Sequence, residues 1–402
     1  MAFAYLQAAL NARKREGLLR QRRIIDSSAG TMIEVDGQHF LSFSGNDYLG
    51  QRQDIAVMQA WVEGISSYGV GSGASPLVTG HTRAHQQLEE FLASGLKREA
   101  ALLFNSGFAA NQAICQALAN PNLCILSDKL MHASFVEAAK HCDGTYKRFR
   151  HNDIDHLTTL FASSNRQAQQ QSQANIQDYL IATEGVFSMD GDLGRLDELH
   201  KVAQQYDAWL MVDDAHGMGV LGKTGLGSAE QLNLSQSQVP ILMGTFGKGI
   251  GTSGAFVAGS QVLIDYLVNF AKHYVYSTAM PPAMAMATYA SFQSLADGVK
   301  QRTLTQRIAQ FRQLCLQTGV PITDSQTAIQ PIVIGDPVKC VKISEDLKQL
   351  GLWVTAIRYP TVPKGTDRLR ITLSASHKHT DIDAFVDALV IVLKRYQVLT
   401  HD

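Results

Sequence analysis

The sequence predicts an α/β protein built on a mostly parallel sheet covered by helices on both faces. From residue 100 onward, short apolar runs alternate with stretches of helical length, a pattern typical of strands joined by crossover helices. The strand candidates in this region are AALLF, LCILSD, YLIATEG, WLMVDDAH, PILMGTF and GAFVAG. The chain has 402 residues, 45% of them hydrophobic and 18% charged, which suffices for two domains with cores of their own.

The other predicted elements follow in chain order. The first segment, MAFAYLQAALNARKREGLLR, is rich in Ala, Leu and Arg without proline, and predicts an amphipathic helix. TMIEVDGQHFLSFS has two apolar runs around Asp36-Gly37 and predicts a β-hairpin. The Gln/Ser/Asn-rich segment 163–177 predicts a surface loop or a frayed helix end. A long helical run extends from Pro281 toward Leu316, after which QPIVIGD, LWVTAIR and LRITLSAS predict a second, smaller sheet.

These elements divide the chain into an N-terminal helix and hairpin segment (1–50), a large domain (51–290) and a small C-terminal α/β domain (291–402). The formal net charge is -1, so we expect no nucleic-acid partner. No stretch approaches the ~20 apolar residues that cross a bilayer, and no secretory signal pattern is present. We therefore expect a cytoplasmic protein that does not engage membranes. The five cysteines include no CxxC pair, which argues against a metal site or a disulfide framework.

The stretch GTFGKGIGTSGA (244–255) surrounds Lys248 with glycines and allows three interpretations. GIGTSG matches a dinucleotide-binding pattern, but the strand-like AFVAG follows where a helix is required. GTFGKG loosely resembles a phosphate loop, but Lys248 is followed by glycine, so the hydroxyl that binds magnesium is missing. In the third interpretation, a tight turn lets the backbone pass close to a flat ligand and presents Lys248 as an amine that can form a Schiff base.

Polar residues that could serve such a lysine follow several strand candidates. WLMVDDAHG ends in Asp213, Asp214 and His216, where a carboxylate could face a pyridinium nitrogen or simply cap a turn. FNSGFAANQ opens a helix at Ser106 and Gly107, which is either a plain helix cap or a phosphate site.

Three further loops add polar groups. DKLMHASF places His132 before a helix, although a lone histidine is more often structural. TEGVFSMDGD places Glu184 and Ser188 after a strand, and HYVYSTAMPPA carries Ser277 and Thr278 before a double proline. Taken together, a phosphate site, a carboxylate, a histidine and an isolated lysine describe a site for pyridoxal 5′-phosphate.

At this point the chain resembles the α-oxoamine synthases, a family of fold-type I pyridoxal-phosphate enzymes. The matches run nearly end to end and include SGNDYLG, YGVGSGAS, LVTGH, FNSGFAANQA, HASF, TEGVFSMDGD, MVDDAHGMGV, TFGKGIGTSGA, YSTAMPPA and TAIRYPTVPKGTDRLRITLSASH. The resemblance implies an aspartate aminotransferase-like fold, with a mostly parallel seven-stranded sheet in the large domain and a smaller α/β C-terminal domain. Many relatives have Gly and Arg where this chain has Ala74 and Pro76, close to the implied substrate entrance.

The resemblance also implies a role for each matching residue. Lys248, His132 and Asp213 would be catalytic, with Lys248 holding the cofactor and later acting as general base. The cofactor-binding residues would be Ser106, Gly107, Phe108, His132, Glu184, Ser188, Asp213, His216, Thr245, Lys248, Ser277 and Thr278, the last two reaching the phosphate of a partner subunit. The substrate-binding residues would be Arg20, Asn46, His132, Thr355 and Arg370. No residue is expected to bind a metal.

Within these sets the implied contacts are specific. Asp213 would pair with the pyridine nitrogen, His216 with the ring hydroxyl, and His132 would stack on the ring face. Arg370 would hold the carboxylate of the amino acid. Arg20 and Thr355 would meet the acyl substrate.

The implied activity is a decarboxylative condensation of an amino acid with an acyl thioester, catalysed by a homodimer whose active site lies at the subunit interface. TAIRYPTVPKGTDRLR favours L-alanine with pimeloyl-CoA or a pimeloyl-carrier protein. The alternatives are sister activities: glycine with acetyl-CoA (glycine C-acetyltransferase, or 2-amino-3-ketobutyrate CoA ligase), glycine with succinyl-CoA, and serine with palmitoyl-CoA. A non-catalytic binding protein of this fold and the hydride-transfer enzyme suggested by GIGTSG are alternatives of other classes.

Overall fold

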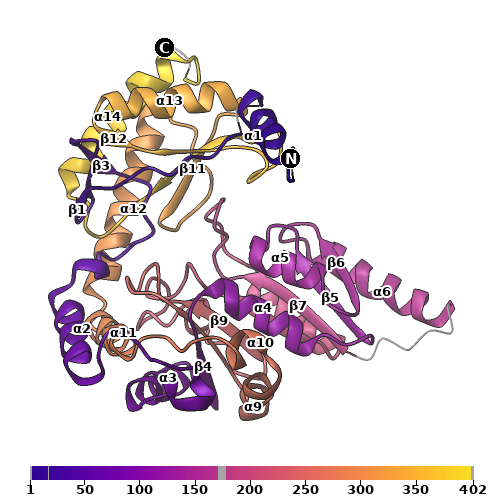
Figure 1. Ribbon diagram of the computed structural model, residues 1–402. Helices are drawn as coiled ribbons and strands as arrows, with labels where there is room; N and C mark the ends of the chain where they lie inside the picture. Colours follow the sequence, from indigo (N-terminus) through magenta and orange to yellow (C-terminus); the bar gives the residue numbers. More distant parts are fainter. Residues whose placement is uncertain (1, 17, 171–177, 400–402) are drawn as a thin grey trace.

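The computed structural model describes residues 2–16, 18–170 and 178–399. Figure 1 shows a larger part that contains the central segment of the chain and a smaller part that combines both of its ends. Helix α12 (Val299–Thr318) runs from one part into the other.

The larger part is built on a seven-stranded sheet of order β4-β10-β9-β8-β7-β5-β6. Every pair of neighbouring strands is parallel except the two pairs made by β10, which runs antiparallel to β4 and β9. This confirms the predicted mostly parallel sheet. The strands are β4 (Ala100–Phe104), β5 (Leu123–Asp128), β6 (Thr145–Phe149), β7 (Asp178–Glu184), β8 (Trp209–Asp213), β9 (Ile241–Thr245) and β10 (Ala255–Gly259).

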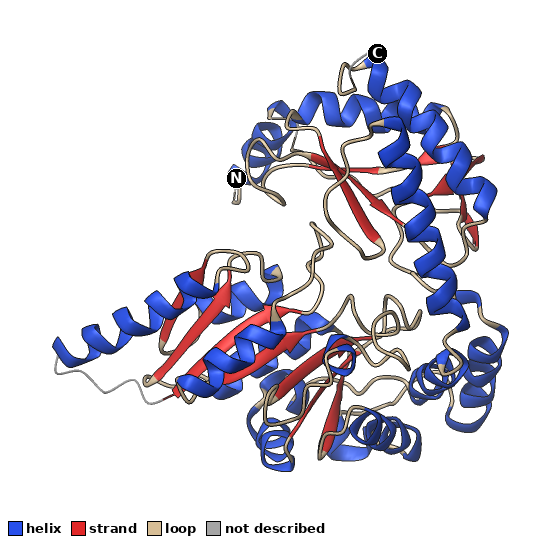
Figure 2. Ribbon diagram, turned by 180° about the vertical axis from the view of Figure 1, so that it is seen from behind, coloured by secondary structure: helices blue, strands red, loops and turns tan. Residues whose placement is uncertain are grey.

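Helices lie on both faces of this sheet (Figure 2). Successive side chains of a strand point to opposite faces, and so Leu126 and Val212 belong to one core while Ile125 and Met211 belong to another. The helices of the larger part are α2 (Ile55–Tyr68), α3 (Arg83–Gly95), α4 (Gly107–Leu118), α5 (Ala133–Lys140), α6 (Ile154–Gln170), α7 (Leu196–Gln205), α8 (Ser228–Gln231), α9 (Gln261–Phe270), α10 (Lys272–Val275) and α11 (Pro282–Leu295).

The smaller part holds two further sheets. One has the order β1-β2-β3-β12 and the other the order β11-β14-β13. Strand β3 pairs in parallel with β12, so the N-terminal hairpin extends a sheet of the C-terminal region. The elements are α1 (Tyr5–Arg15), β1 (Ser27–Ala29), β2 (Met32–Val35), β3 (Gln38–Ser42), β11 (Ile329–Val333), α13 (Pro337–Gln349), β12 (Leu352–Trp353), β13 (Thr355–Ile357), β14 (Arg368–Thr372) and α14 (His379–Arg395).

Several predicted elements differ in their limits. The helical run from Pro281 is divided into α11 and α12, because Gly298 adopts a φ of 69° that a helix interior does not allow. LWVTAIR supplies two strands of different sheets, β12 and β13, instead of one. In the segment 163–177, helix α6 continues to Gln170, and residues 171–177 lie outside the described residues. In the part of the chain that the structure describes, no helix has the length and apolar character needed to cross a membrane.

Candidate active site

A pocket of about 310 Å³ opens at the edge of the large sheet where its parallel strands end. Asp213 and Glu184 are the last residues of β8 and β7, and Lys248 follows β9. Carboxyl ends of parallel strands are the usual location of ligands in such sheets. The predicted residues that line the pocket are Asn46, Ser106, Gly107, Phe108, His132, Glu184, Asp213, His216, Thr245 and Lys248.

Lys248 lies in the turn between β9 and the antiparallel β10. Gly251 and Gly254 have φ values of 72° and 107° in this turn, and these positive angles explain why the turn needs glycines. Burial lowers the pKa of the Lys248 amine, against the opposing attraction of the Asp213 and Glu184 carboxylates. The amine is therefore held in a state that gives up its proton more readily than an exposed lysine.

Asp213 is 4% exposed and keeps its carboxylate in place through two donors. Asn111 Nδ2 donates to Asp213 Oδ2 at 2.9 Å, and the backbone N–H of Ala215 donates to Oδ1 at 3.1 Å. The neighbouring Asp214 is fully buried and receives a hydrogen bond from the backbone N–H of Ser228 at 2.6 Å. Burial raises the pKa of Asp214 to about 7, and of this acidic pair it is Asp213 that lines the pocket.

His132 is oriented by the helix that it caps. Its Nδ1 lies 2.7 Å from Ser134 Oγ and accepts from the backbone N–H of Ser134 at 3.3 Å. Ser134 Oγ in turn accepts from Asn111 Nδ2 at 3.0 Å. Burial lowers the pKa of His132. A neutral imidazole whose Nδ1 accepts carries its proton on Nε2, and this ring forms one wall of the pocket.

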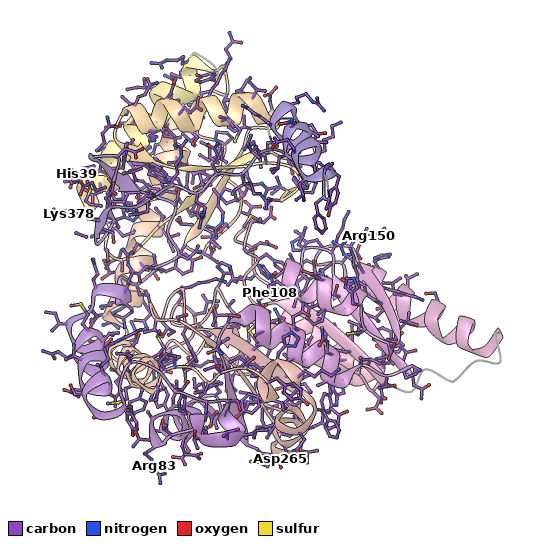
Figure 3. The ribbon with its side chains drawn as sticks, viewed as in Figure 1. His39, Arg83, Phe108, Arg150, Asp265 and Lys378 are labelled. Atoms are coloured by element: carbon purple, nitrogen blue, oxygen red, sulfur yellow. The ribbon has the colours of Figure 1, made fainter. Side chains whose placement is uncertain are left out.

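The start of α4 also lines the pocket. Ser106 caps the helix by accepting from the backbone N–H of Ala109 at 3.2 Å. A Cβ atom at Gly107 would lie 2.6 Å from Thr245 Cγ2, so the close approach of the start of α4 to the end of β9 requires a glycine. Figure 3 shows Phe108 at this helix end, on the side that faces the smaller part. Unpaired N–H groups at a helix N-terminus attract anions.

A cleft of about 950 Å³ adjoins the pocket, and Asn46, His132, His216 and Lys248 line both. Arg370, on β14, is 7% exposed and donates to the Ser188 carbonyl at 2.7 Å and to Asn46 Oδ1 at 3.2 Å. A guanidinium has more N–H donors than these two bonds use, and Arg370 lines the cleft. Arg20, Ser188 and Thr355 also line the cleft, and Arg20 Nη2 donates to Thr361 Oγ1 at 3.4 Å.

Two predicted residues lie apart from the Lys248 pocket. Ser277 and Thr278 line a different pocket, with Asn105 lining both. The Ser277 hydroxyl donates to the carbonyl of His273 at 2.6 Å, while Thr278 is exposed. Within one chain these two side chains therefore do not join the other predicted cofactor residues.

Three residues of the site were not among the predicted ones: Tyr48, Asn111 and Ser134. Each lies inside one of the motifs that carry the family resemblance, SGNDYLG, FNSGFAANQA or HASF. They contact other site residues through side-chain hydrogen bonds. Their position next to predicted site residues was the only signal in the sequence. In the described ranges, no group of three or more His, Cys, Asp or Glu residues is arranged to hold a metal ion.

The amino-acid sequence is similar to those of known proteins over most of its length. The family model for aminotransferase class I and II matches residues 38–389. The curated 8-amino-7-oxononanoate synthase of Thioalkalivibrio sulfidiphilus is 47% identical over 385 residues, which are 96% of this chain and 96% of that protein.

Solved structures show the same likeness. The 8-amino-7-oxononanoate synthase of Francisella tularensis is 27% identical with a TM-score of 0.76, over 90% of this chain and 99% of that one. The serine palmitoyltransferase of Sphingomonas wittichii is 26% identical with a TM-score of 0.90, over 99% of this chain and 100% of that one. The likeness therefore extends over nearly the full length of each chain.

Proposed function

The chain belongs to the aminotransferase class I and II family and, within it, to the 8-amino-7-oxononanoate synthases, and we propose on this basis that it condenses L-alanine with a pimeloyl thioester. The acyl carrier is coenzyme A or a carrier protein. The products are 8-amino-7-oxononanoate, carbon dioxide and the free thiol of the carrier, a step of biotin biosynthesis. We place this reaction in the cytoplasm and assign it to a pyridoxal-phosphate enzyme.

The residues of the Lys248 pocket fit pyridoxal phosphate. Glu184 Oε1 and Asn111 Oδ1 are buried without a hydrogen-bond partner in the described part of the chain, and both residues line the pocket, which is the condition expected where a polar ligand binds. The bare backbone at Gly107 suits a phosphate, and the Asp213 carboxylate suits a protonated ring nitrogen.

When bound, pyridoxal phosphate supplies a carbonyl that amines attack and a ring that withdraws electrons from the α-carbon of an amino acid. Ser106, Gly107, Phe108 and Thr245 would hold the phosphate, and Ser188 would lie beside the cofactor. Asp213 would keep the proton on the ring nitrogen, because a buried carboxylate stabilises the cation opposite it. His132 would cover the ring face, and Glu184 would support His132.

Lys248 would move the proton of the reaction. Its lowered pKa increases the fraction of free amine at neutral pH, and a base works best when its pKa lies near the operating pH. Arg370 lowers the same pKa further through its positive charge. The freed amine would take the α-proton of L-alanine at Nζ.

The cleft beside the pocket would hold both substrates. Arg370 would bind the L-alanine carboxylate with the donors that Asn46 and Ser188 leave available, because a guanidinium pairs with a carboxylate through two parallel hydrogen bonds. Arg20 would bind the distal carboxylate of the pimeloyl chain in the same way, with Thr355 beside the chain. The walls of the cleft would exclude water from the reacting atoms.

One observation carries this proposal: the amine of Lys248 stands at the junction of the pocket and the cleft and lines both. A lysine in that position can meet a cofactor on one side and substrates on the other. One reaction then accounts for the glycine-rich turn that carries Lys248, for Asp213 in the pocket and for Arg370 in the cleft.

We propose in addition that the enzyme is a homodimer and that Ser277 and Thr278 complete the phosphate site of the partner subunit. The support is their location outside their own pocket and the strongly exposed apolar residues near them, Tyr276 at 81% and Val78 at 73%, since large exposed apolar patches mark interaction surfaces. Mixing inactive Lys248→Ala subunits with inactive Thr278→Arg subunits should restore activity. A failure to restore it, with mixed dimers demonstrated, would contradict shared sites.

The reaction is tested by measuring thiol release from each pairing of L-alanine, glycine and L-serine with pimeloyl-, acetyl-, succinyl- and palmitoyl-CoA. We expect release only with L-alanine and pimeloyl-CoA. Release with a glycine or serine pair would assign a sister activity instead. Absence of release with every CoA thioester calls for the same assay with a pimeloyl-carrier protein, and absence there as well would overturn the proposal.

A further inference from the structure

The mechanism above leaves one buried hydroxyl of the site without a role. Tyr48 is 1% exposed and lies in the loop that follows β3. Its Oη is 2.7 Å from Nδ1 of His216, a residue 168 positions later in the chain. The same oxygen is 3.2 Å from Asn46 Oδ1. Tyr48 thus contacts both a cofactor-pocket residue and a cleft residue.

The geometry indicates which atom donates in the Tyr48–His216 contact. A separation of 2.7 Å is typical of an O–H donor, whereas N–H donors usually lie 2.9–3.0 Å from oxygen. Asn46 Oδ1 already accepts from Arg370 Nη1 at 3.2 Å. Its distance from Tyr48 Oη, 3.2 Å, is also longer than the 2.7 Å between Tyr48 Oη and His216 Nδ1. The phenol proton therefore lies on the bond to His216 Nδ1, and Nδ1 is the acceptor.

The surroundings of His216 favour the neutral imidazole that such a bond requires. The charged or titratable side chains that act on it are Lys248, Arg370 and His132, together with Tyr48 itself. Burial, with the positive charges of Lys248 and Arg370, lowers the pKa of His216 well below its ordinary value. A neutral ring with Nδ1 as acceptor has its proton on Nε2, and Nε2 is the nitrogen left for a ligand in the pocket.

We propose that Tyr48 is a positioning residue that holds His216 in the Nε2–H tautomer, so that the ring presents a hydrogen-bond donor to the Lys248 pocket. Asn46, beside Tyr48, is held in turn by Arg370, whose Nη1 donates to Asn46 Oδ1 at the cleft. The tautomer is a property of the protein alone. Only the identity of the group that Nε2 meets, the ring hydroxyl of the cofactor, rests on the proposed function.

The test compares Tyr48→Phe with a matched control in the cofactor-free protein. Tyr48→Phe removes one oxygen and keeps the ring, so the packing of the buried site is retained. Tyr146→Phe is the control, because it removes another phenol, one that hydrogen-bonds Ser127 Oγ at 2.9 Å. Long-range ¹H–¹⁵N spectra of protein with ¹⁵N-labelled histidine report which ring nitrogen carries the proton, and the signals of His216 are identified by their loss in His216→Gln.

We expect the wild type and Tyr146→Phe to show a protonated Nε2 and a bare Nδ1 at His216. In Tyr48→Phe the ratio of the two tautomers should shift toward Nδ1–H by about 5-fold, which corresponds to the loss of one buried hydrogen bond. A proton on Nδ1 in the wild type, or an unchanged ratio in Tyr48→Phe, would overturn the proposal.

A second readout separates this inference from the proposed reaction. In the cofactor-loaded enzyme, Tyr48→Phe should lower kcat about 5-fold or more, and Tyr146→Phe should leave it unchanged. If the L-alanine reaction were not found at all, the spectra would still decide the tautomer. If the reaction were found and the tautomer were wrong, only the role of Tyr48 would fail.

Discussion

The substitution His151→Gln is expected to destabilise the protein, because it removes two ion pairs that His151 makes with Asp128 and Asp192. We call these two ion pairs the clamp. His151 Nδ1 lies 3.0 Å from Asp128 Oδ1, and Nε2 lies 2.8 Å from Asp192 Oδ2. Asp128 is fully buried and ends β5, just before the loop that carries His132. Asp192 belongs to the loop that follows Ser188. The clamp therefore joins two loops that line the cleft.

The size of the effect follows from the pKa of His151. The side chain is partly buried, which by itself would lower that pKa, but the hydrogen bonds and charges of Asp128 and Asp192 outweigh burial and raise the pKa from 6.5 to about 10. At ~1.4 kcal/mol per pH unit, a rise of this size corresponds to about 5 kcal/mol of folding free energy. The His151 side chain is 28% exposed, and screening by solvent reduces the expected contribution to about 3 kcal/mol.

The pH dependence has a definite sign. Because the folded-state pKa is raised, the stabilisation is complete below the unfolded value of 6.5 and is lost as the pH rises through about 10. The free energy of unfolding of the wild type should exceed that of His151→Gln by about 3 kcal/mol at pH 6. The difference should shrink steadily between pH 7 and pH 10.

The assay is urea unfolding followed by tryptophan fluorescence at several pH values between 6 and 10. His39→Gln is the control, because His39 is an exposed imidazole on β3 (Figure 3), and it should match the wild type throughout. A difference between wild type and His151→Gln that is equal at pH 6 and pH 9.5 would refute the reasoning, since the charge on His151 would then contribute nothing.

Three further predictions concern the substrates and the cofactor. Arg20→Ala should raise the KM for the pimeloyl donor about 10-fold or more with little change in kcat, while Arg22→Ala, two residues further along the chain, should change neither; equal effects would contradict a specific contact. Arg370→Lys should raise the KM for L-alanine about 10-fold, because a point charge cannot make two parallel hydrogen bonds; initial rates with varied L-alanine decide this, and an unchanged KM would remove Arg370 from the carboxylate site. Asp213→Asn should lower kcat about 10²-fold, because a neutral amide does not stabilise a proton on the ring nitrogen; single-turnover rates equal to those of the wild type would contradict that pairing.

Much of the fold could be predicted from the sequence because the central strands are buried on both sides. LCILSD, WLMVDD and PILMGTF are largely apolar runs, as such strands must be. Strand β6 was not predicted, since its sequence TYKRF carries polar residues and most of its side chains are only partly buried, whereas β4, at the other edge of the sheet, is apolar and mostly buried. The break before α12 depends on the backbone of one glycine, Gly298, which the surrounding helical pattern concealed.

The site could be predicted in part for a related reason. Asp213 and Lys248 follow apolar strands directly, and the topology of a parallel sheet brings such positions to one edge. Tyr48, Asn111 and Ser134 could not be found in this way, because their role is to hold other side chains. For Tyr48 and Asn111 the hydrogen bonds involved join residues far apart in the chain, with 168 positions between Tyr48 and His216 and 102 between Asn111 and Asp213. No local pattern of the sequence records such pairings.

The most direct test of the central claim is to reduce the cofactor-loaded protein with borohydride and map the modified residue by mass spectrometry. Reduction makes an imine between a lysine and the cofactor permanent. The peptide containing Lys248 should carry the reduced cofactor, and Lys248→Ala should carry none. Attachment at another lysine, or attachment that persists in Lys248→Ala, would contradict it.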